Sequence, residues 1–345
     1  MANKFTDFNP GIINSGGIKN FIINGDFNIW QRGATFSGIA PNVPTWTSDH
    51  FQVTHSSSGV MALSQGGTPS VDKIGYKGNY SLAATVSTVD SAMAAGEYCM
   101  ILTYIEGYDA AKLAGKTVTI SFWVYASVTG IYCISLRNTG LTSSYIAEYT
   151  VNQATTWEKK TITVLMPDFS TGSWNSTNGA GVFICWAMSA GSTYNSGSNQ
   201  VWNSGNLLST TNQINMMATN NATLAISTVQ LEIGAVATPF EYRPFIEELI
   251  RCQRYYEISG EGFGSYTIIN SGVTSGSWYY ARTKFLVVKR ATPLISLIND
   301  AVSGFPATVG TITGHNPYGF QETRVCNSTV PSGYFSSGWV ANAEV

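Results

Sequence analysis

The sequence predicts an all-β protein, in which a jelly-roll β-sandwich is followed by a short linker helix and a smaller β-rich C-terminal domain. Charged residues make up only 11% of the 345 residues, against about 25% in ordinary soluble domains. The 34 glycines, with abundant Ser, Thr and Asn, supply turns instead. Short segments alternate between apolar and polar residues, and we find no convincing long amphipathic helix. Together these features are typical of a β-sandwich, most simply a jelly roll.

We divide the chain into three parts. Residues 1–18 are polar and end in Asn14-Ser-Gly-Gly-Ile18, so we expect an N-terminal arm that is ordered only against a partner. Residues 19–245 carry most of the strand patterns and form the predicted jelly-roll domain. Residues 246–345 comprise the linker helix and the β-rich C-terminal domain.

Alternation predicts the main strands. The clearest lies at 117–126, and we expect 131–137 to return as its hairpin partner. Residues 157–166 place three apolar side chains on one face, and 182–188 are nearly all apolar, which predicts a strand buried on both faces. Another strong strand is predicted at 278–288, with Tyr, Ala, Thr, Phe and Val on one parity.

The segment 222–257 predicts the exit from the first domain. The apolar positions change parity at Ser227-Thr228, which indicates a β-bulge or two short strands. Pro244 suits the first turn of a helix, and acidic residues early and basic residues late in that helix match its macrodipole. A helix of two to three turns is not stable alone, so it must pack against another part of the protein. Its apolar positions share one face: Ile246, Leu249 and Ile250.

Two long polar segments, 168–181 and 191–211, suggest functional loops. Carbohydrate binding requires aromatic faces beside Asn, Asp or Gln side chains, and aromatic residues give large contact areas at low entropic cost. Trp174, Tyr194 and Trp202 stand in this setting, and we predict them as glycan contacts. Packing of the loops against the sandwich, or contact within a trimer, is the alternative. We expect four other tryptophans of this domain to be packing residues: Trp30, Trp46, Trp123 and Trp186.

In the C-terminal domain, four aromatic residues are candidates for contacts at a distal tip: Tyr279, Tyr280, Tyr318 and Trp339. Packing within a trimer is the alternative that we favour for them.

The sequence argues against several other functions. A net charge of −2 gives no basic surface for nucleic acid, and neither a membrane-spanning segment nor a signal peptide is predicted. No nucleophile elbow, P-loop or dinucleotide motif occurs, so we predict no catalytic residues, no cofactor and no enzyme.

The five cysteines are expected to be buried thiols, and the three histidines are expected to be surface or turn residues. Three acidic residues are interpreted as ordinary loop acids: Glu97, Glu106 and Asp109.

Five segments resemble one family of bacteriophage and prophage tail-fibre-like structural proteins. They are Asn20-Phe-Ile-Ile-Asn-Gly-Asp-Phe-Asn-Ile-Trp-Gln-Arg-Gly33, Thr45-Trp-Thr-Ser-Asp-His-Phe51, Leu113-Ala-Gly-Lys-Thr-Val-Thr-Ile-Ser-Phe-Trp-Val124, the junction from Gln230 to Tyr256, and Gly338-Trp-Val-Ala-Asn-Ala-Glu-Val345.

This resemblance implies a carbohydrate-binding-module-like jelly roll in a homotrimeric virion fibre or spike. The implied function is recognition of host-surface polysaccharide, with residues 1–18 docking on other virion proteins. A purely structural tail, collar or capsid-decoration subunit is the alternative, and a polysaccharide depolymerase is a third. Modules of this kind often hold calcium between the Asn-Gly-Asp-Phe position and a late-strand Asp. Here Asp26 is present but Ser227 occupies the late position, so we predict no metal.

Overall fold

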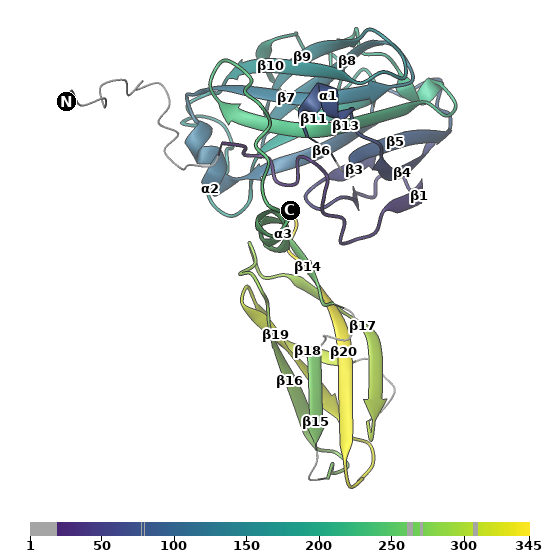
Figure 1. Ribbon diagram of the computed structural model, residues 1–345, viewed down its shortest axis with the longest axis vertical. Helices are drawn as coiled ribbons and strands as arrows, with labels where there is room; N and C mark the ends of the chain where they lie inside the picture. The colour runs from purple at the N-terminus through teal and green to yellow at the C-terminus, as the bar shows by residue number, and fades with distance from the viewer. Residues whose placement is uncertain (1–18, 77, 79, 261–264, 270–271, 306–309) are drawn as a thin grey trace, which may run out of the picture.

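The computed structural model describes residues 19–76, 78, 80–260, 265–269, 272–305 and 310–345. The expected arm at 1–18 lies outside these residues. A rounded body contains strands β1 to β13, and an elongated body contains β14 to β20 (Figure 1). Helix α3 (Phe245–Gln253) lies at the waist between them.

The rounded body is a sandwich of two sheets whose strand pairings are all antiparallel. The six-stranded sheet runs β1 (Thr35–Ile39), β4 (Val60–Gly66), β5 (Ser81–Thr88), β13 (Thr223–Ile233), β7 (Thr117–Ala126) and β10 (Glu158–Leu165). The seven-stranded sheet runs β12 (Val201–Ser204), β9 (Ser143–Val151), β8 (Gly130–Asn138), β11 (Ala180–Ala190), β6 (Tyr98–Glu106), β3 (Gln52–His55) and β2 (Thr45–Trp46). Short helical turns connect strands: α1 (Val71–Ile74), α2 (Gly107–Ala110), η2 (Ala111–Leu113) and η3 (Met216–Ala218). The predicted fold class is confirmed.

The core lies between the two sheets. Phe122 of β7 meets Trp186 of β11 edge-to-face, with ring centroids 5.7 Å apart, and both are fully buried. The alternation that predicted β7 is therefore the alternation between core and outer face. The predicted hairpin with residues 131–137 is wrong, because β7 pairs with β13 and β10 whereas β8 pairs with β11 and β9. Residues 127–129 cross between the sheets, so both strands bury an apolar face in the same core.

The predicted bulge at Ser227-Thr228 is confirmed. The register of β13 against β7 shifts between Ser227 and Gln230, and Thr228 has a φ of 48°. The shift lets residues on both sides of the bulge keep apolar side chains in the core.

Helix α3 begins after Pro244 and docks through its polar face. Glu248 and Cys252 are buried, whereas Ile246 and Ile250 are 59% and 47% exposed. The buried Glu248 carboxylate accepts a hydrogen bond from the backbone N–H of Asn24 and pairs with Arg243 at 3.2 Å. The apolar face expected to hold the helix in place therefore faces outward.

The elongated body contains two small antiparallel sheets. In one, β20 (Gly333–Asn342) pairs with β14 (Tyr256–Ile258), β15 (Ser265–Ile269) and β17 (Leu294–Ser303). In the other, β19 (Gly319–Val325) pairs with β16 (Trp278–Lys284) and β18 (Thr311–Asn316). Apolar side chains such as Phe305 and Phe335, with ring centroids 5.2 Å apart, pack between the sheets.

Candidate functional site

A pocket of about 310 Å³ lies on the outer face of the seven-stranded sheet. Alternation along β6 explains its position. Cys99 and Ile101 point into the sandwich core, so Tyr98, Met100 and Tyr104 point outward and line the pocket. This face is partly covered because the 191–211 segment folds over it.

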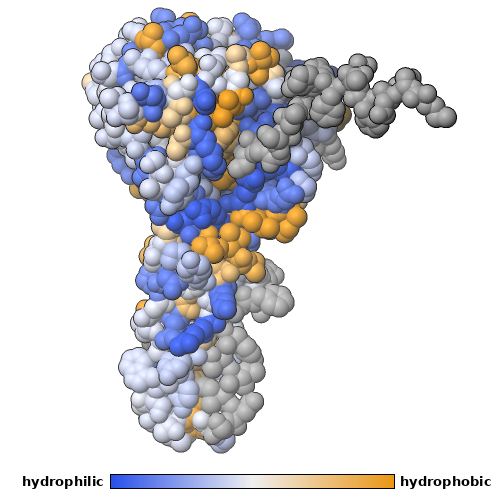
Figure 2. Space-filling model, turned by 90° about the vertical axis from the view of Figure 1, so that its left-hand side faces the viewer, coloured by the Kyte–Doolittle hydropathy of each residue, from blue (hydrophilic) through white to orange (hydrophobic). Residues whose placement is uncertain are grey.

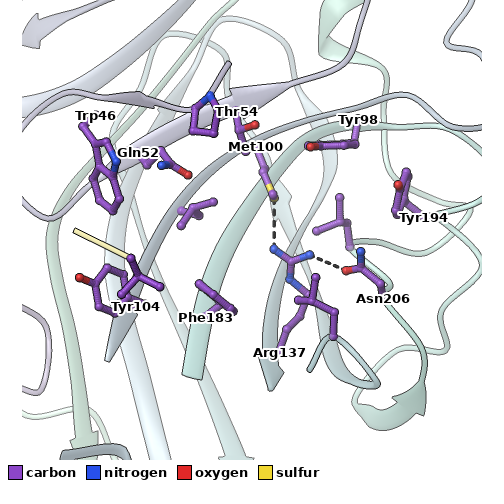
Figure 3. Close-up of a pocket in the computed structure, with 15 residues that line it drawn as sticks. Trp46, Gln52, Thr54, Tyr98, Met100, Tyr104, Arg137, Phe183, Tyr194 and Asn206 are labelled. Carbon is purple, nitrogen blue, oxygen red and sulfur yellow. Dashed lines mark hydrogen bonds between the residues drawn. The ribbon is translucent and has the colours of Figure 1, made fainter. Parts of the chain in front are cut away.

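Aromatic side chains form much of the pocket wall (Figure 3). Tyr98 and Tyr194 meet edge-to-face with centroids 5.2 Å apart, and Trp46 and Tyr104 do so at 6.2 Å. Strand β11 adds Phe183 between these pairs. The volume falls at the small end of the range of about 300–1,000 Å³ that is usual for ligand pockets.

Polar side chains in the pocket keep unused hydrogen-bonding capacity. Gln52 and Thr54 are 8% and 6% exposed, yet neither side chain has a hydrogen-bond partner among the described residues. Arg137 Nη1 donates to Asn206 Oδ1 at 2.6 Å, which leaves the Asn206 amide N–H₂ without an acceptor in the described part of the chain. Because these groups line the pocket and no described protein group bonds them, they are available to a ligand.

This combination suits a sugar. Aromatic faces contact the apolar C–H faces of a pyranose, while amide and hydroxyl groups bond its hydroxyls. Glycoside hydrolysis ordinarily needs two carboxyl groups flanking the bond, and no Asp or Glu side chain is among the described residues that line the pocket.

The structure separates the three predicted glycan contacts of the first domain. Tyr194 lines the pocket. Trp174 stacks on Phe169 with centroids 4.0 Å apart and meets Trp202 edge-on at 5.6 Å. Trp202 Nε1 also donates to the Leu165 carbonyl at 2.9 Å. These two tryptophans pack loops against the sandwich rim, outside the pocket, and direct glycan contact by them stays a prediction.

The four aromatic candidates of the C-terminal domain are dispersed. Tyr280 and Tyr318 are 56% and 68% exposed, on β16 and in the turn before β19. Tyr279 packs against Phe305, and its hydroxyl accepts a hydrogen bond from the Thr274 N–H. Trp339 is only 5% exposed and packs against the rings of Phe285 and Phe320, so it is a core residue.

Sequence reasoning missed most of the pocket. Trp46 was assigned to the core, but it is half-buried and lines the pocket. Tyr98 and Tyr104 were not identified because a strand with apolar side chains on both parities is typical of a fully buried strand. One usable signal existed: Arg137 is the only charged residue in the apolar run of β8.

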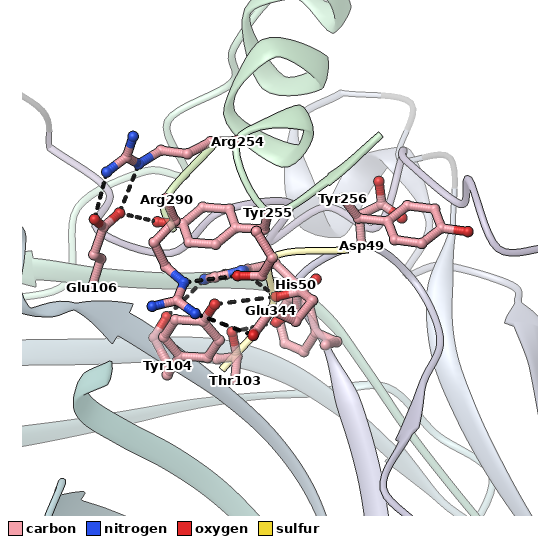
Figure 4. Close-up of polar contacts among 12 residues, drawn as sticks. Asp49, His50, Thr103, Tyr104, Glu106, Arg254, Tyr255, Tyr256, Arg290 and Glu344 are labelled. Atoms are coloured by element: carbon pink, nitrogen blue, oxygen red, sulfur yellow. Dashed lines mark hydrogen bonds and ion pairs between the residues drawn. The ribbon is translucent and has the colours of Figure 1, made fainter. Parts of the chain in front are cut away.

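A buried polar network joins the two bodies beside the pocket (Figure 4). Tyr104 Oη donates to Glu344 at 3.1 Å, Arg32 pairs with Glu344 at 3.1 Å, and His50 Nδ1 lies 3.6 Å from it. Burial alone would raise the pKa of Glu344, but the hydrogen bonds and charges of these neighbours bring it below its ordinary value. Burial raises the pKa of the adjacent Asp49 to about 6.

This network corrects two expectations. Glu106 is a buried junction residue that binds Arg254 and the Tyr255 hydroxyl, at 2.6 Å in each case. His50 and His55 are buried, and the Nε2–H of each ring donates a hydrogen bond to a backbone carbonyl. Both are thus interior and not surface residues, although His50 does lie in a turn, and the Nδ1 atom of each ring is buried without a hydrogen-bond partner among the described residues.

Among the described residues, no group of three or more His, Cys, Asp or Glu side chains is placed to hold a metal ion. No helix in the described part of the chain is long and apolar enough to cross a membrane.

Comparison with known proteins finds no matching family model and no matching curated protein. Solved structures give weak likenesses. The enzymatically active domain of tailspike protein 4 of bacteriophage CBA120 is 13% identical, with a TM-score of 0.32, over 54% of this chain and 19% of that chain. The module TmCBM61, solved with β-1,4-galactotriose, is 9% identical, with a TM-score of 0.29, over 63% of this chain and 100% of that chain. The family 11 carbohydrate-binding module of a Clostridium thermocellum cellulosomal cellulase is 10% identical, with a TM-score of 0.29, over 60% and 99%. At these TM-scores the likenesses assign neither a family nor a function to this chain.

Proposed function

We propose that this protein binds carbohydrate in the pocket on the outer face of its seven-stranded sheet. One observation carries the proposal: the buried side chains of Gln52 and Thr54, without partners among the described residues, lie among aromatic faces in a pocket of ligand size. These polar groups have no protein partner among the described residues, so a ligand hydroxyl can bond them.

The wider role that we propose is host-surface recognition by a virion fibre or spike subunit of a bacteriophage or prophage. It is supported by the five sequence segments that resemble tail-fibre-like proteins. The same resemblance supports a homotrimer that docks on other virion proteins through residues 1–18. We propose binding without catalysis, so release of reducing sugar from host polysaccharide would contradict this part.

The test is binding of the purified full chain to a glycan array and to extracted host surface polysaccharide. Trp46→Ala should weaken binding by about tenfold or more, because it removes an aromatic wall of the pocket. Trp123→Ala is the matched control, because Trp123 lies on the outer face of the other sheet, with the Lys73 ammonium 5.8 Å from its ring centroid. Equal affinities of the two variants would refute the pocket as the site.

A second candidate function is that of a purely structural virion subunit. The observation that favours it is the exposed apolar face of α3. Phe245 and Ile246 are 58% and 59% exposed, and Figure 2 shows apolar surface gathered at the waist. Exposed apolar patches mark interaction surfaces. Absence of glycan binding, together with tight association of the wild-type chain with another virion protein, would favour this function.

A further inference from the structure

Arg137 lies in the pocket as a buried cation, 4% exposed, without an anionic partner among the described residues. Nη1 donates to Asn206 Oδ1 at 2.6 Å, while Nη2 contacts Cys185 Sγ at 3.0 Å and Met100 Sδ at 3.6 Å. Sulfur is a weak acceptor, and the buried Nε has no partner among the described residues. In the described part of the chain, no oxygen atom accepts a hydrogen bond from Nε or Nη2 of this guanidinium.

Other buried arginines of this chain are neutralised by carboxylates. Arg243 lies 3.2 Å from Glu248, and Arg324 lies 2.9 Å from Glu322. Both are buried to a similar degree as Arg137. Because a guanidinium stays charged in proteins, burying one without a counter-charge is costly. Arg137 is thus an exception that packing alone does not explain.

The guanidinium points into the pocket between Met100 and Asn206 (Figure 3). No Asp or Glu side chain is among the described lining residues. We infer that the ligand is an acidic sugar whose anionic group pairs with Arg137 while its ring lies against the aromatic walls. This inference rests on the proposed carbohydrate-binding function and narrows its ligand class.

The open hydrogen-bonding capacity of the guanidinium defines the anion. Nε is buried, so a ligand reaches the Nη groups, of which Nη2 contacts only the weak acceptors Cys185 Sγ and Met100 Sδ. The carboxylate of a uronic or sialic acid is a stronger acceptor for such N–H groups, and so is a sulfate or phosphate ester on a sugar.

The experiment measures binding of monosaccharides to the full chain by isothermal titration and thermal shift at fixed ionic strength. The carboxylate probes are glucuronate, galacturonate and N-acetylneuraminate, and the ester probes are galactose 6-sulfate and glucose 6-phosphate. Neutral probes are glucose, galactose and N-acetylglucosamine. We expect at least one anionic probe to bind about 10- to 100-fold more tightly than its neutral counterpart. The carboxylate and ester probes tell the two sources of the oxyanion apart.

Two variants test the role of Arg137. Arg137→Met removes the charge, and Asn206→Asp places a carboxylate beside Nη1 that neutralises it within the protein. Both should lose the preference for anionic over neutral probes. Without ligand, both should be at least as thermally stable as the wild type, because the unpaired buried charge is gone or paired.

Three results would overturn the assignment of an acidic sugar to Arg137. They are binding of neutral probes alone, an anion preference that survives in both variants, and a marked loss of stability in both variants. In the first case the proposed carbohydrate binding would stand. Absence of binding by any probe, with no binding on the glycan array, would overturn both.

Discussion

The junction between the two bodies depends on Glu106, which ends β6 of the sandwich. Its carboxylate accepts hydrogen bonds from Arg254 Nη2 at 2.6 Å, from Arg254 Nε at 2.8 Å and from Tyr255 Oη at 2.6 Å. Glu106 is 5% exposed and Tyr255 is 2% exposed. Burial raises the pKa of Tyr255, and the carboxylate beside its hydroxyl raises it further, so the hydroxyl stays a donor throughout the ordinary pH range.

We predict that Glu106→Ala lowers the free energy of unfolding by about 3 kcal/mol. Breaking a buried ion pair on one side costs roughly 3–5 kcal/mol, because the other group loses its partner. The lower end applies because the Arg254 side chain is 32% exposed and can regain water. Glu106→Gln keeps the shape and loses only the charge, so its cost should be about 1–2 kcal/mol.

The assay is urea unfolding followed by tryptophan fluorescence and circular dichroism. Asp109→Ala is the matched control, because Asp109 pairs with Lys112 at 2.6 Å while the side chains are 38% and 57% exposed. Exposed pairs contribute about 0–1 kcal/mol. If Glu106→Ala cost no more than this control, the account of the junction would be refuted.

Two further predictions concern pH and assembly. Burial, followed by repulsion from Glu248, raises the pKa of Asp26 from 3.8 to about 6. The stability that its protonated form contributes is thus fully present below pH 3.8 and is lost as the pH rises through 6. Asp26→Asn should therefore exceed the wild type by about 1–3 kcal/mol at pH 7.5 and match it near pH 4 in urea unfolding; a gap independent of pH would count against this. The double variant Ile246→Glu/Ile250→Glu should sediment as a monomer while the wild type and the exposed-site control Val89→Glu sediment as trimers, and a trimer that survives the double change would exclude the α3 face as an interface.

The strands could be predicted from the sequence because each one has its own two-residue periodicity. The core face of β7 and the bulge at Ser227-Thr228 depend only on nearby residues. The pairing of β7 could not be predicted, because strands of both sheets bury the same kind of face and periodicity does not identify partners. The face through which α3 docks could not be predicted either, because burial of Glu248 depends on its contacts with Arg243 and with Asn24, which is distant in the sequence.

The site was predicted only where it lies on a loop, at Tyr194. The rest comes from outward-facing residues of strands that are also covered on that side, so Tyr98 and Tyr104 resemble core residues in sequence. Trp174 and Trp202 show the opposite error: they lie in polar segments of the sequence, yet they meet each other edge-on and pack against the sandwich. Whether a loop aromatic packs or projects depends on long-range contacts that local sequence does not encode.

The most direct measurement is a crystal structure of the protein with the oligosaccharide that binds best on the glycan array. We expect a sugar ring within about 4 Å of Trp46 or Tyr98, with its hydroxyls bonded to Gln52 or Thr54. A sugar bound instead at the Trp174–Trp202 rim or on the exposed face of β16, with the pocket empty, would exclude the pocket as the carbohydrate site.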